Sequence, residues 1–163
     1  MAFYSWEEQL RIGKLGEKVL DSFFKQSYDV VGVSIESDLK GIDRIVSRED
    51  IDEEVRVEYK TDILSFITRN VFIETCKRMR DGVCEKRGWF YYSESDWLVY
   101  YIPQEDKIII TYFDVLRRWY HYFGEYYPTG VSQNKSYQSE GVLMPVEVLE
   151  SLSFKVYDLS EYY

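Results

Sequence analysis

The first regular pattern in the chain is a helical one near the N-terminus. Apolar residues recur three or four positions apart, at Ile12, Leu15, Val19, Leu20, Phe23 and Phe24, and this spacing is typical of one buried helix face. Ser5 and Glu8 have the spacing of a capping box, so the sequence predicts a helix over residues 6–25. Gly13 and Gly16 lie inside it at a cost of about 1 kcal/mol each relative to Ala. We therefore expect a tight packing contact, another backbone or a ligand close to this part of the helix.

Strand-like patterns follow the helix. Residues 28–35 and 41–47 are rich in Val and Ile, and residues 55–60 alternate between apolar and polar positions. The polar run 48–54 reads as a loop between the second and third of these strands, and residues 71–75 favour a further strand. The order of elements is thus one helix followed by three strands.

The second half of the chain predicts a hairpin, two helices and a last strand. Residues 96–102 and 107–112 form the hairpin, a helix covers 114–126, and a short helix over 145–152 begins at Pro145. Residues 128–141 are rich in Gly, Ser, Asn and Gln, which favours a mobile polar loop, and residues 154–159 favour a strand. There is no repeat and no long linker, so we expect a single domain of class α/β (α+β) over residues 1–163.

Composition removes several kinds of site. The 163 residues carry a net charge of −9 and include 16 Tyr, two Cys and one His. Cys76 and Cys84 with His121 cannot supply a four-ligand zinc site, and we expect His121 to be a packed or surface side chain. The sequence has no nucleotide-binding glycine motif, no apolar run of about 18 residues and no signal-like N-terminus. We therefore expect a cytoplasmic protein without a membrane segment, whose abundant carboxylates favour Mg²⁺ or Mn²⁺ chemistry.

Three residues on two neighbouring strands form the candidate site. Glu58 and Lys60 point to the same face of their strand because side chains alternate. If residues 41–47 pair antiparallel with 55–60, Asp43 lies opposite or diagonal to Glu58. Two carboxylates and an ammonium group then converge, and this set could bind a divalent metal and orient a water molecule.

At these residues the chain resembles the PD-(D/E)XK nuclease superfamily, which contains restriction-endonuclease-like and Holliday-junction-resolvase-like enzymes. Asp43 matches the first acid of its signature, Glu58-Tyr59-Lys60 matches the second element, and Glu17 matches a glutamate on the preceding helix. Ile42 stands where the signature has proline, and the chain lacks a clear glutamine motif after Lys60. The resemblance covers residues 13–62. It implies a restriction-endonuclease-like fold with a central mixed β-sheet flanked by helices.

The resemblance also implies a function, namely a Mg²⁺- or Mn²⁺-dependent endonuclease that hydrolyses phosphodiester bonds in DNA. Asp43, Glu58 and the carbonyl of Tyr59 would hold the metal, Glu17 would reach the same or a second ion, and Lys60 would position the attacking water. Such enzymes leave a 5′-phosphate. Structure-specific cleavage of a duplex or a branched junction usually takes two sites, which favours a homodimer.

A basic segment follows the candidate site. Residues 69–88 contain six cations and three acids, a net charge of +3, and could bind phosphates. The predicted DNA-binding residues are Arg69, Lys77, Arg78, Arg80, Lys86 and Arg87. The aromatic run 89–92 could stack on bases, although a buried strand or helix is the simpler interpretation, and Glu74 could add a further acid to the site.

Two other interpretations remain open. Glu58 and Lys60 could form a solvated ion pair on an exposed strand face, worth about 0–1 kcal/mol. Alternatively, the net charge of −9 suits a non-catalytic acidic binding protein, either a DNA mimic that inhibits a nucleic-acid enzyme or a degenerate nuclease fold that serves as an assembly module. A mimic needs acids spread along one exposed face, whereas a nuclease needs them to converge beside Lys60.

Overall fold

The computed structural model describes residues 5–50, 52–133 and 137–162 as two β-sheets with six α-helices. The helices are α1 (Trp6–Phe24), α2 (Ile35–Leu39), α3 (Ser65–Thr68), α4 (Trp89–Tyr92), α5 (Phe113–Phe123) and α6 (Val146–Leu152). Three short 3₁₀ helices cover Pro103–Glu105, Gly124–Tyr126 and Leu159–Glu161. The fold class is therefore mixed α/β of the α+β type.

The larger sheet is mixed and contains six strands. Its order is β1 (Asp29–Gly32), β2 (Arg44–Arg48), β3 (Glu53–Thr61), β6 (Trp97–Ile102), β7 (Lys107–Tyr112) and β10 (Lys155–Asp158). Strands β3 and β6 are parallel, and every other neighbouring pair in this sheet is antiparallel. The chain thus forms an antiparallel β1–β2–β3 meander before it crosses to a parallel strand.

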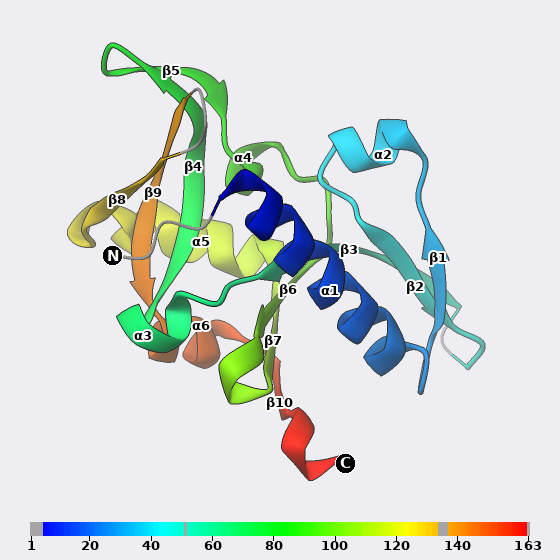
Figure 1. The fold of residues 1–163 in the computed structure, drawn as a ribbon. Coiled ribbons are helices and arrows are strands. Elements are labelled where there is room, and N and C mark those ends of the chain that lie inside the picture. Colours follow the sequence, from blue (N-terminus) through cyan, green and yellow to red (C-terminus); the bar gives the residue numbers. More distant parts are fainter. Residues whose placement is uncertain (1–4, 51, 134–136, 163) are drawn as a thin grey trace.

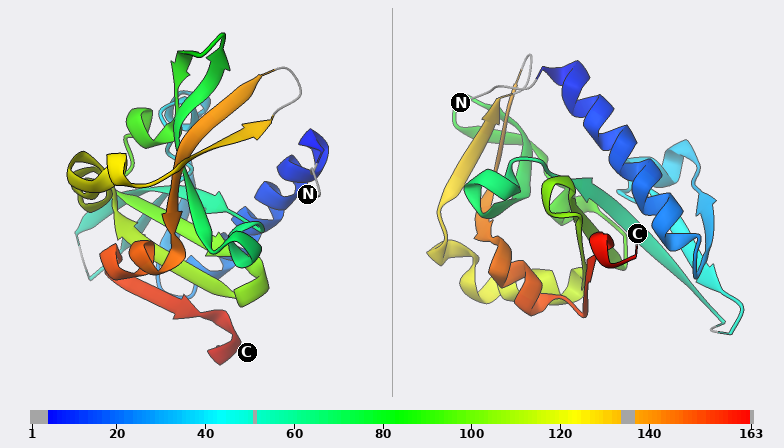
Figure 2. Two further views of the ribbon diagram at one scale, coloured as in Figure 1. Left: turned by 90° about the vertical axis from the view of Figure 1, so that its left-hand side faces the viewer. Right: turned by 60° about the horizontal axis from the view of Figure 1, so that its bottom comes forward.

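The smaller sheet has four strands. Two of them, β4 and β5, lie between β3 and β6 in the chain, and the other two, β8 and β9, come later. Its order is β5 (Val83–Arg87), β4 (Asn70–Arg80), β9 (Gln138–Pro145) and β8 (Thr129–Gln133), all antiparallel. Figure 1 shows this sheet on the left and strands β1 and β2 on the right, with α1 in front between them. Figure 2 shows the smaller sheet and α1 from two further directions.

Side chains alternate between the two faces of the larger sheet, and an apolar core lies on each face. Val57, Tyr59, Val99 and Tyr101 join Leu20 and Phe24 of α1 and related residues in one apolar cluster. Leu98 and Tyr100 point the other way, into a cluster that also contains residues of β4, β9, α4, α5 and α6. The central strands are therefore covered on both faces, and the second face of the sheet meets the smaller sheet.

Helix α1 begins and packs as its sequence predicts. Ser5 and Glu8 form the reciprocal hydrogen bonds of a capping box. A Cβ atom on Gly16 would lie 1.8 Å from Oγ1 of Thr61 in β3, so the helix approaches the sheet too closely for any other residue there without a shift. The predicted hairpin over residues 96–112 is also confirmed, with its turn in the 3₁₀ helix Pro103–Glu105.

Two predicted elements are wrong. Residues 128–141 are not a polar loop, because β8 and the first half of β9 lie in this segment and β9 pairs with β4; residues 134–136 lie outside the described part. The strand predicted over 28–35 ends at Gly32, and Ser34 then caps α2.

A disulfide joins Cys76 in β4 to Cys84 in β5. None of the helices described is long and apolar enough to cross a membrane.

Candidate active site

The Asp43 and Glu58 carboxylates lie together at one end of the β2–β3 pair. Asp43 is the residue before β2, and its backbone N–H donates a 2.8 Å hydrogen bond to the carbonyl of Val57. The pairing of Arg44 with Val57 continues this register and places Asp43 across from Glu58. The backbone N–H of Tyr59 donates to Asp43 Oδ2 at 2.6 Å. The predicted antiparallel pairing therefore brings the two acids together.

Gly41 allows the chain to pass closely over Glu58. Its φ of 68° lies in the left-handed region, and a Cβ atom there would lie 2.8 Å from Glu58 Oε2. Hydroxyl groups of Ser93 and Ser95 donate to the Gly41 carbonyl at 2.8 and 2.7 Å and hold this turn in place. Glu58 is consequently only 3% exposed.

Lys60 occupies the position that alternation predicts, on the same face of β3 as Glu58. Its Nζ atom donates a hydrogen bond to Glu58 Oε1 and lies 5.4 Å from the centre of the Trp89 ring. Its side chain is 30% exposed, so solvent or a ligand can reach the cation. The second carboxylate oxygen of Glu58, Oε2, is buried and has no hydrogen-bond partner within the described residues.

The environment of the site shifts the pKa values of Asp43 and Lys60. Burial, followed by the negative charge of Glu58, raises the pKa of Asp43 to about 6, although Lys60 and the Tyr59 amide oppose the shift. Burial disfavours the charged form of Lys60, but Glu58 and Asp43 outweigh it and raise the lysine pKa above its ordinary value. Lys60 is therefore a cation at neutral pH.

Two further ionisable groups face this cluster from the smaller sheet and α4. Burial raises the pKa of Glu74 in β4, while Lys60 acts in the opposite direction, and the backbone N–H of Trp89 donates to Glu74 Oε1 at 3.4 Å. Burial likewise raises the pKa of Tyr92, with Lys60 again opposing. The sequence indicated Glu74 through its strand position, but no local pattern distinguished Tyr92 from its aromatic neighbours.

Glu17 borders the same pocket as Asp43, and after burial and Glu58 its negative charge is a smaller cause of the raised pKa of Asp43. It lies on α1, against the opposite face of the sheet, and its Oε2 atom accepts a 3.1 Å hydrogen bond from Arg44 Nη2. Arg44 also donates to Asp21 at 3.0 Å and to the backbone carbonyl of Asp43 at 2.7 Å. No three Asp, Glu, His or Cys side chains of the described residues form a group that could hold a metal. Asp43 and Glu58 are the two carboxylates that the strand pairing brings together, and the contact of Glu17 with the same or a second ion stays a prediction.

A pocket of about 530 Å³ adjoins Asp43 on the α1 side of the sheet. Its walls come from α1, the end of β1, the beginning of α2 and the start of β2, and they include Glu17, Asp21, Asp38, Asp43 and Arg44. Asp43 stands at the strand end and borders both this pocket and the carboxylate–lysine cluster.

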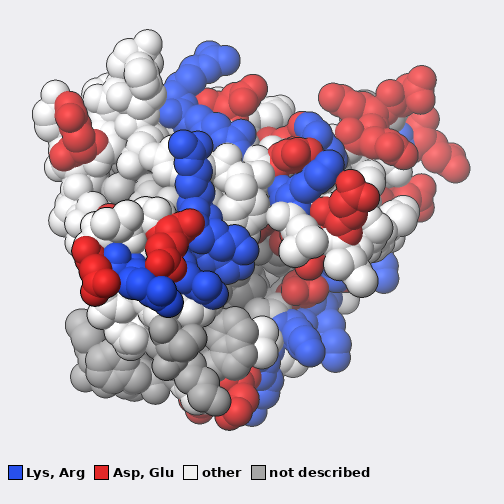
Figure 3. Space-filling view, turned by 90° about the horizontal axis from the view of Figure 1, so that it is seen from above, with Lys and Arg blue, Asp and Glu red and all other residues white. Residues whose placement is uncertain are grey.

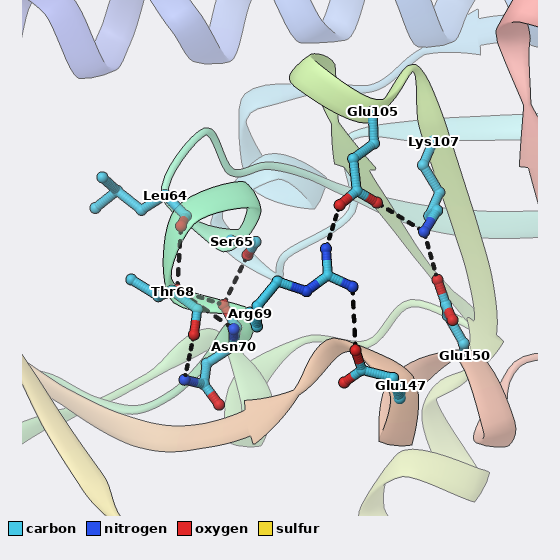
Figure 4. Close-up of polar contacts among 9 residues, drawn as sticks. All are labelled: Leu64, Ser65, Thr68, Arg69, Asn70, Glu105, Lys107, Glu147 and Glu150. Carbon is cyan, nitrogen blue, oxygen red and sulfur yellow. Dashed lines mark hydrogen bonds and ion pairs between the residues drawn. The ribbon is translucent and has the colours of Figure 1, made fainter.

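The predicted DNA-binding residues occupy two different environments. Arg69 precedes β4, and its guanidinium donates to Glu105 and, at 3.0 Å, to Glu147 (Figure 4). Lys107 contacts Glu105 at 2.7 Å and Glu150 at 2.8 Å, so the cluster contains two cations and three acids. The charge of Arg69 is thus neutralised within the fold, which sequence position alone did not indicate.

The other five predicted cations lie on the β4–β5 hairpin, namely Lys77, Arg78, Arg80, Lys86 and Arg87. Arg78 and Arg87 lie over the rings of Tyr137 and Tyr91, at 5.1 and 5.6 Å, and Arg80 pairs with Glu85 at 3.3 Å. On the face that includes this hairpin, basic and acidic side chains are interspersed (Figure 3). The hairpin therefore offers separate cations rather than one continuous basic surface.

The arrangement combines two hard oxygen donors with one cation in a partly enclosed place. Carboxylate oxygens are ligands of Mg²⁺ and Mn²⁺, and a fixed cation can stabilise negative charge that develops on a bound phosphate.

No family model, curated protein or solved structure with which the chain was compared matches it.

Proposed function

We propose that this protein is a Mg²⁺- or Mn²⁺-dependent nuclease that hydrolyses phosphodiester bonds in DNA. The observation that carries the proposal is the convergence of Asp43 and Glu58 beside Lys60, with Glu58 Oε2 buried and unpartnered in the described structure. A buried carboxylate oxygen without a partner is costly, and a metal ion bound to it would remove that cost.

The residues present fit the metal that this reaction requires. Mg²⁺ is commonly bound through one or two protein carboxylates and completes its shell with water and substrate oxygens. Asp43 and Glu58 would hold the ion, together with the Tyr59 carbonyl. Burial and, after it, repulsion from Glu58 raise the pKa of Asp43, and a bound cation would reduce that repulsion. When bound, the metal would lower the pKa of a water ligand and neutralise charge on the scissile phosphate.

Lys60 supplies the cation of the site. In the metal-free protein burial lowers the pKa of Lys60, but Glu58 and Asp43 outweigh it and raise that pKa overall, so Lys60 is protonated at neutral pH. Its three N–H donors can orient the attacking water and contact a phosphate oxygen. Attack of the water on phosphorus, with cleavage of the bond to the 3′-oxygen and protonation of that oxygen by solvent, would leave the 5′-phosphate that the family resemblance implies. Glu17 would influence the site through Arg44, which binds the backbone carbonyl of Asp43.

The order of elements supports a restriction-endonuclease-like fold. A helix precedes an antiparallel three-strand meander, the acids lie just before its second strand and on its third strand, and β6 lies parallel to β3 after the crossover. The burial of Glu58 does not favour an acidic DNA mimic, which needs its acids along an exposed face. We extend the proposal to a homodimer, because two sites are needed to cut both strands of a duplex at once.

Cleavage of linear, nicked and four-way-junction DNA with Mg²⁺ or Mn²⁺ tests this function. Lys60→Ala should reduce the cleavage rate on the order of 10²–10³-fold, and Glu58→Gln should reduce it similarly, whereas Glu54→Gln, on the exposed part of β3, should cut like the wild type. Mn²⁺ should also raise the melting temperature of the wild type more than that of Asp43→Asn. Failure of the wild type to cut any of these substrates, or single-stranded DNA, would overturn the proposal.

A further inference from the structure

The pocket beside Asp43 has the size of a binding site for a small organic group. Its volume of about 530 Å³ falls within the range of about 300–1,000 Å³ that is usual for ligand pockets. Gly32 at the end of β1 lines it, and a Cβ atom on Gly32 would meet nothing within 4 Å. The side chains of Val30, Val33 and Ile35 contribute apolar surface to the walls, and Ile35 is 82% exposed.

The charges of the pocket exclude a phosphate group and favour a hydrogen-bond donor. Four carboxylates line it, against the two cations Lys25 and Arg44. The guanidinium of Arg44 is already engaged by Asp21, Glu17 and the Asp43 carbonyl, so it cannot also clamp an anion. A neutral group that carries N–H donors suits such walls, because carboxylates accept hydrogen bonds from exocyclic amines of bases.

Two polar groups in the walls are available for a ligand. In the part of the chain that is described, neither the ammonium group of Lys25 nor the carboxylate of Asp38 takes part in an ion pair or a side-chain hydrogen bond. Together they offer a donor and a two-oxygen acceptor. Guanine presents matching groups, since its N1–H and exocyclic amine can face a carboxylate while its O6 and N7 atoms accept hydrogen bonds.

On the basis of the proposed nuclease function, we infer that this pocket binds one unpaired nucleobase with an exocyclic amine, next to the scissile phosphate. Asp43 borders both the pocket and the carboxylate–lysine cluster, so a base in the pocket belongs to a nucleotide close to the bond that is cut. A base within a duplex cannot enter, and extruding it is least costly where it is already unpaired. The substrate class is therefore DNA with an unpaired nucleotide at the cleavage position.

Three substrates of otherwise identical sequence test the inference, one fully paired, one with an unpaired guanine and one with an unpaired hypoxanthine. Hypoxanthine differs from guanine only in lacking the exocyclic amine. The wild type should cut the guanine substrate roughly tenfold faster than the hypoxanthine one, the usual scale for losing a base-specific contact, and should cut the paired one slowest. Gly32→Leu, which fills the pocket, should cut all three at one low rate.

The control variant is Gly13→Leu on α1. A Cβ atom on Gly13 would also meet nothing within 4 Å, but Gly13 does not line the pocket, so this variant should keep the wild-type preference. Equal rates of the wild type on paired DNA and on unpaired guanine would overturn the inference while leaving the nuclease function intact.

A binding measurement separates the pocket from catalysis. Unpaired 2-aminopurine carries an exocyclic amine and becomes more fluorescent when it leaves the base stack. With EDTA present, the wild type and Gly13→Leu should raise the fluorescence of a duplex containing this base, and Gly32→Leu should not. If the wild type cuts no DNA and yet raises the fluorescence, the nuclease function fails and the pocket stands; no rise with the wild type overturns the pocket.

Discussion

The environment of the Asp43 carboxylate favours its neutral form more than water does, because the group is buried and lies near Glu58. Burial and the nearby negative charge of Glu58 raise its pKa to about 6 in the folded protein, compared with about 3.9 for an unperturbed carboxyl group. Because the folded state binds this proton more tightly, the resulting stabilisation is fully present below about pH 3.9. It is lost as the pH rises through about 6.

Replacing Asp43 with Asn should therefore stabilise the metal-free protein at neutral pH. The amide retains an acceptor for the Tyr59 N–H but carries no charge. With EDTA at pH 7.5, we expect the free energy of unfolding of Asp43→Asn to exceed that of the wild type by about 1–3 kcal/mol, with the difference vanishing near pH 4. Urea denaturation at both pH values measures this. Asp29→Asn, on the exposed strand β1, should show no such gain; equal stabilities of Asp43→Asn and wild type at pH 7.5 would contradict the account.

The parts of the site that could be predicted from sequence depend on local rules. Alternation puts Glu58 and Lys60 on one face, and a short antiparallel connection brings Asp43 across from them. The partner of Glu17 could not be predicted, because Arg44 meets it only when α1 packs on the sheet. Tyr92 comes from a short helix that follows the inserted hairpin, so its contribution also depends on tertiary packing.

At the scale of elements, the contact between α1 and β3 determines how the helix sits beside the site. Gly13 and Gly16 both weaken the helix by about 1 kcal/mol relative to Ala, but only Gly16 faces the sheet closely, with Thr61 1.8 Å from where its Cβ atom would lie. Thr61 is two residues from Tyr59 and adjacent to Lys60. Gly16 is thus needed for close packing, as the sequence suggested for this stretch.

Replacing Gly13 and Gly16 with Ala should change the free energy of unfolding in opposite directions. Gly13→Ala should raise the free energy of unfolding by about 0.5–1 kcal/mol, since the new methyl group meets nothing within 4 Å. Gly16→Ala should lower it by about 1–3 kcal/mol because the methyl group overpacks against Thr61. Thr61→Ala should recover part of that loss in the double variant, which urea denaturation would reveal. A stabilising Gly16→Ala would show that the helix is not held at this distance.

The largest error in predicting elements concerns residues 128–141, whose described part belongs mainly to strands β8 and β9 rather than to a loop. Gly and polar residues in this segment resemble a loop, yet β9 lies between β4 and β8 in the smaller sheet. Gly141 in β9 has its Cα so close to β4 that a Cβ atom would lie 2.6 Å from the Ile73 carbonyl. Gly141 therefore allows two strands to approach closely and does not form a turn. The sequence near Gly141 does not show this, because the partner strand β4 is distant in sequence.

At the scale of the whole molecule, the proposed nuclease function requires a protein with a net charge of −9 to bind a polyanion. Arg69 cannot help, because Glu105 and Glu147 surround its guanidinium in the network that joins the start of β4, the β6–β7 turn and α6 (Figure 4). We therefore propose that attraction to DNA depends on the exposed cations of the β4–β5 hairpin, where Arg78 lies opposite Lys86 in the strand register. The disulfide between Cys76 and Cys84 closes this hairpin and fixes the two strands that carry these cations.

The salt dependence of DNA binding distinguishes these two sets of cations. Each phosphate contact contributes about −0.9 to the slope of log K against log salt concentration for duplex DNA. Replacing Arg78 and Lys86 together with Ala should therefore weaken binding and make the slope less negative by about 0.9–1.8, measured by fluorescence anisotropy across a salt series with EDTA. Arg69→Ala is the matched control, and it should leave the slope unchanged because its charge is already neutralised by two glutamates. An unaltered slope in the Arg78 and Lys86 double variant would mean that the hairpin faces away from the DNA.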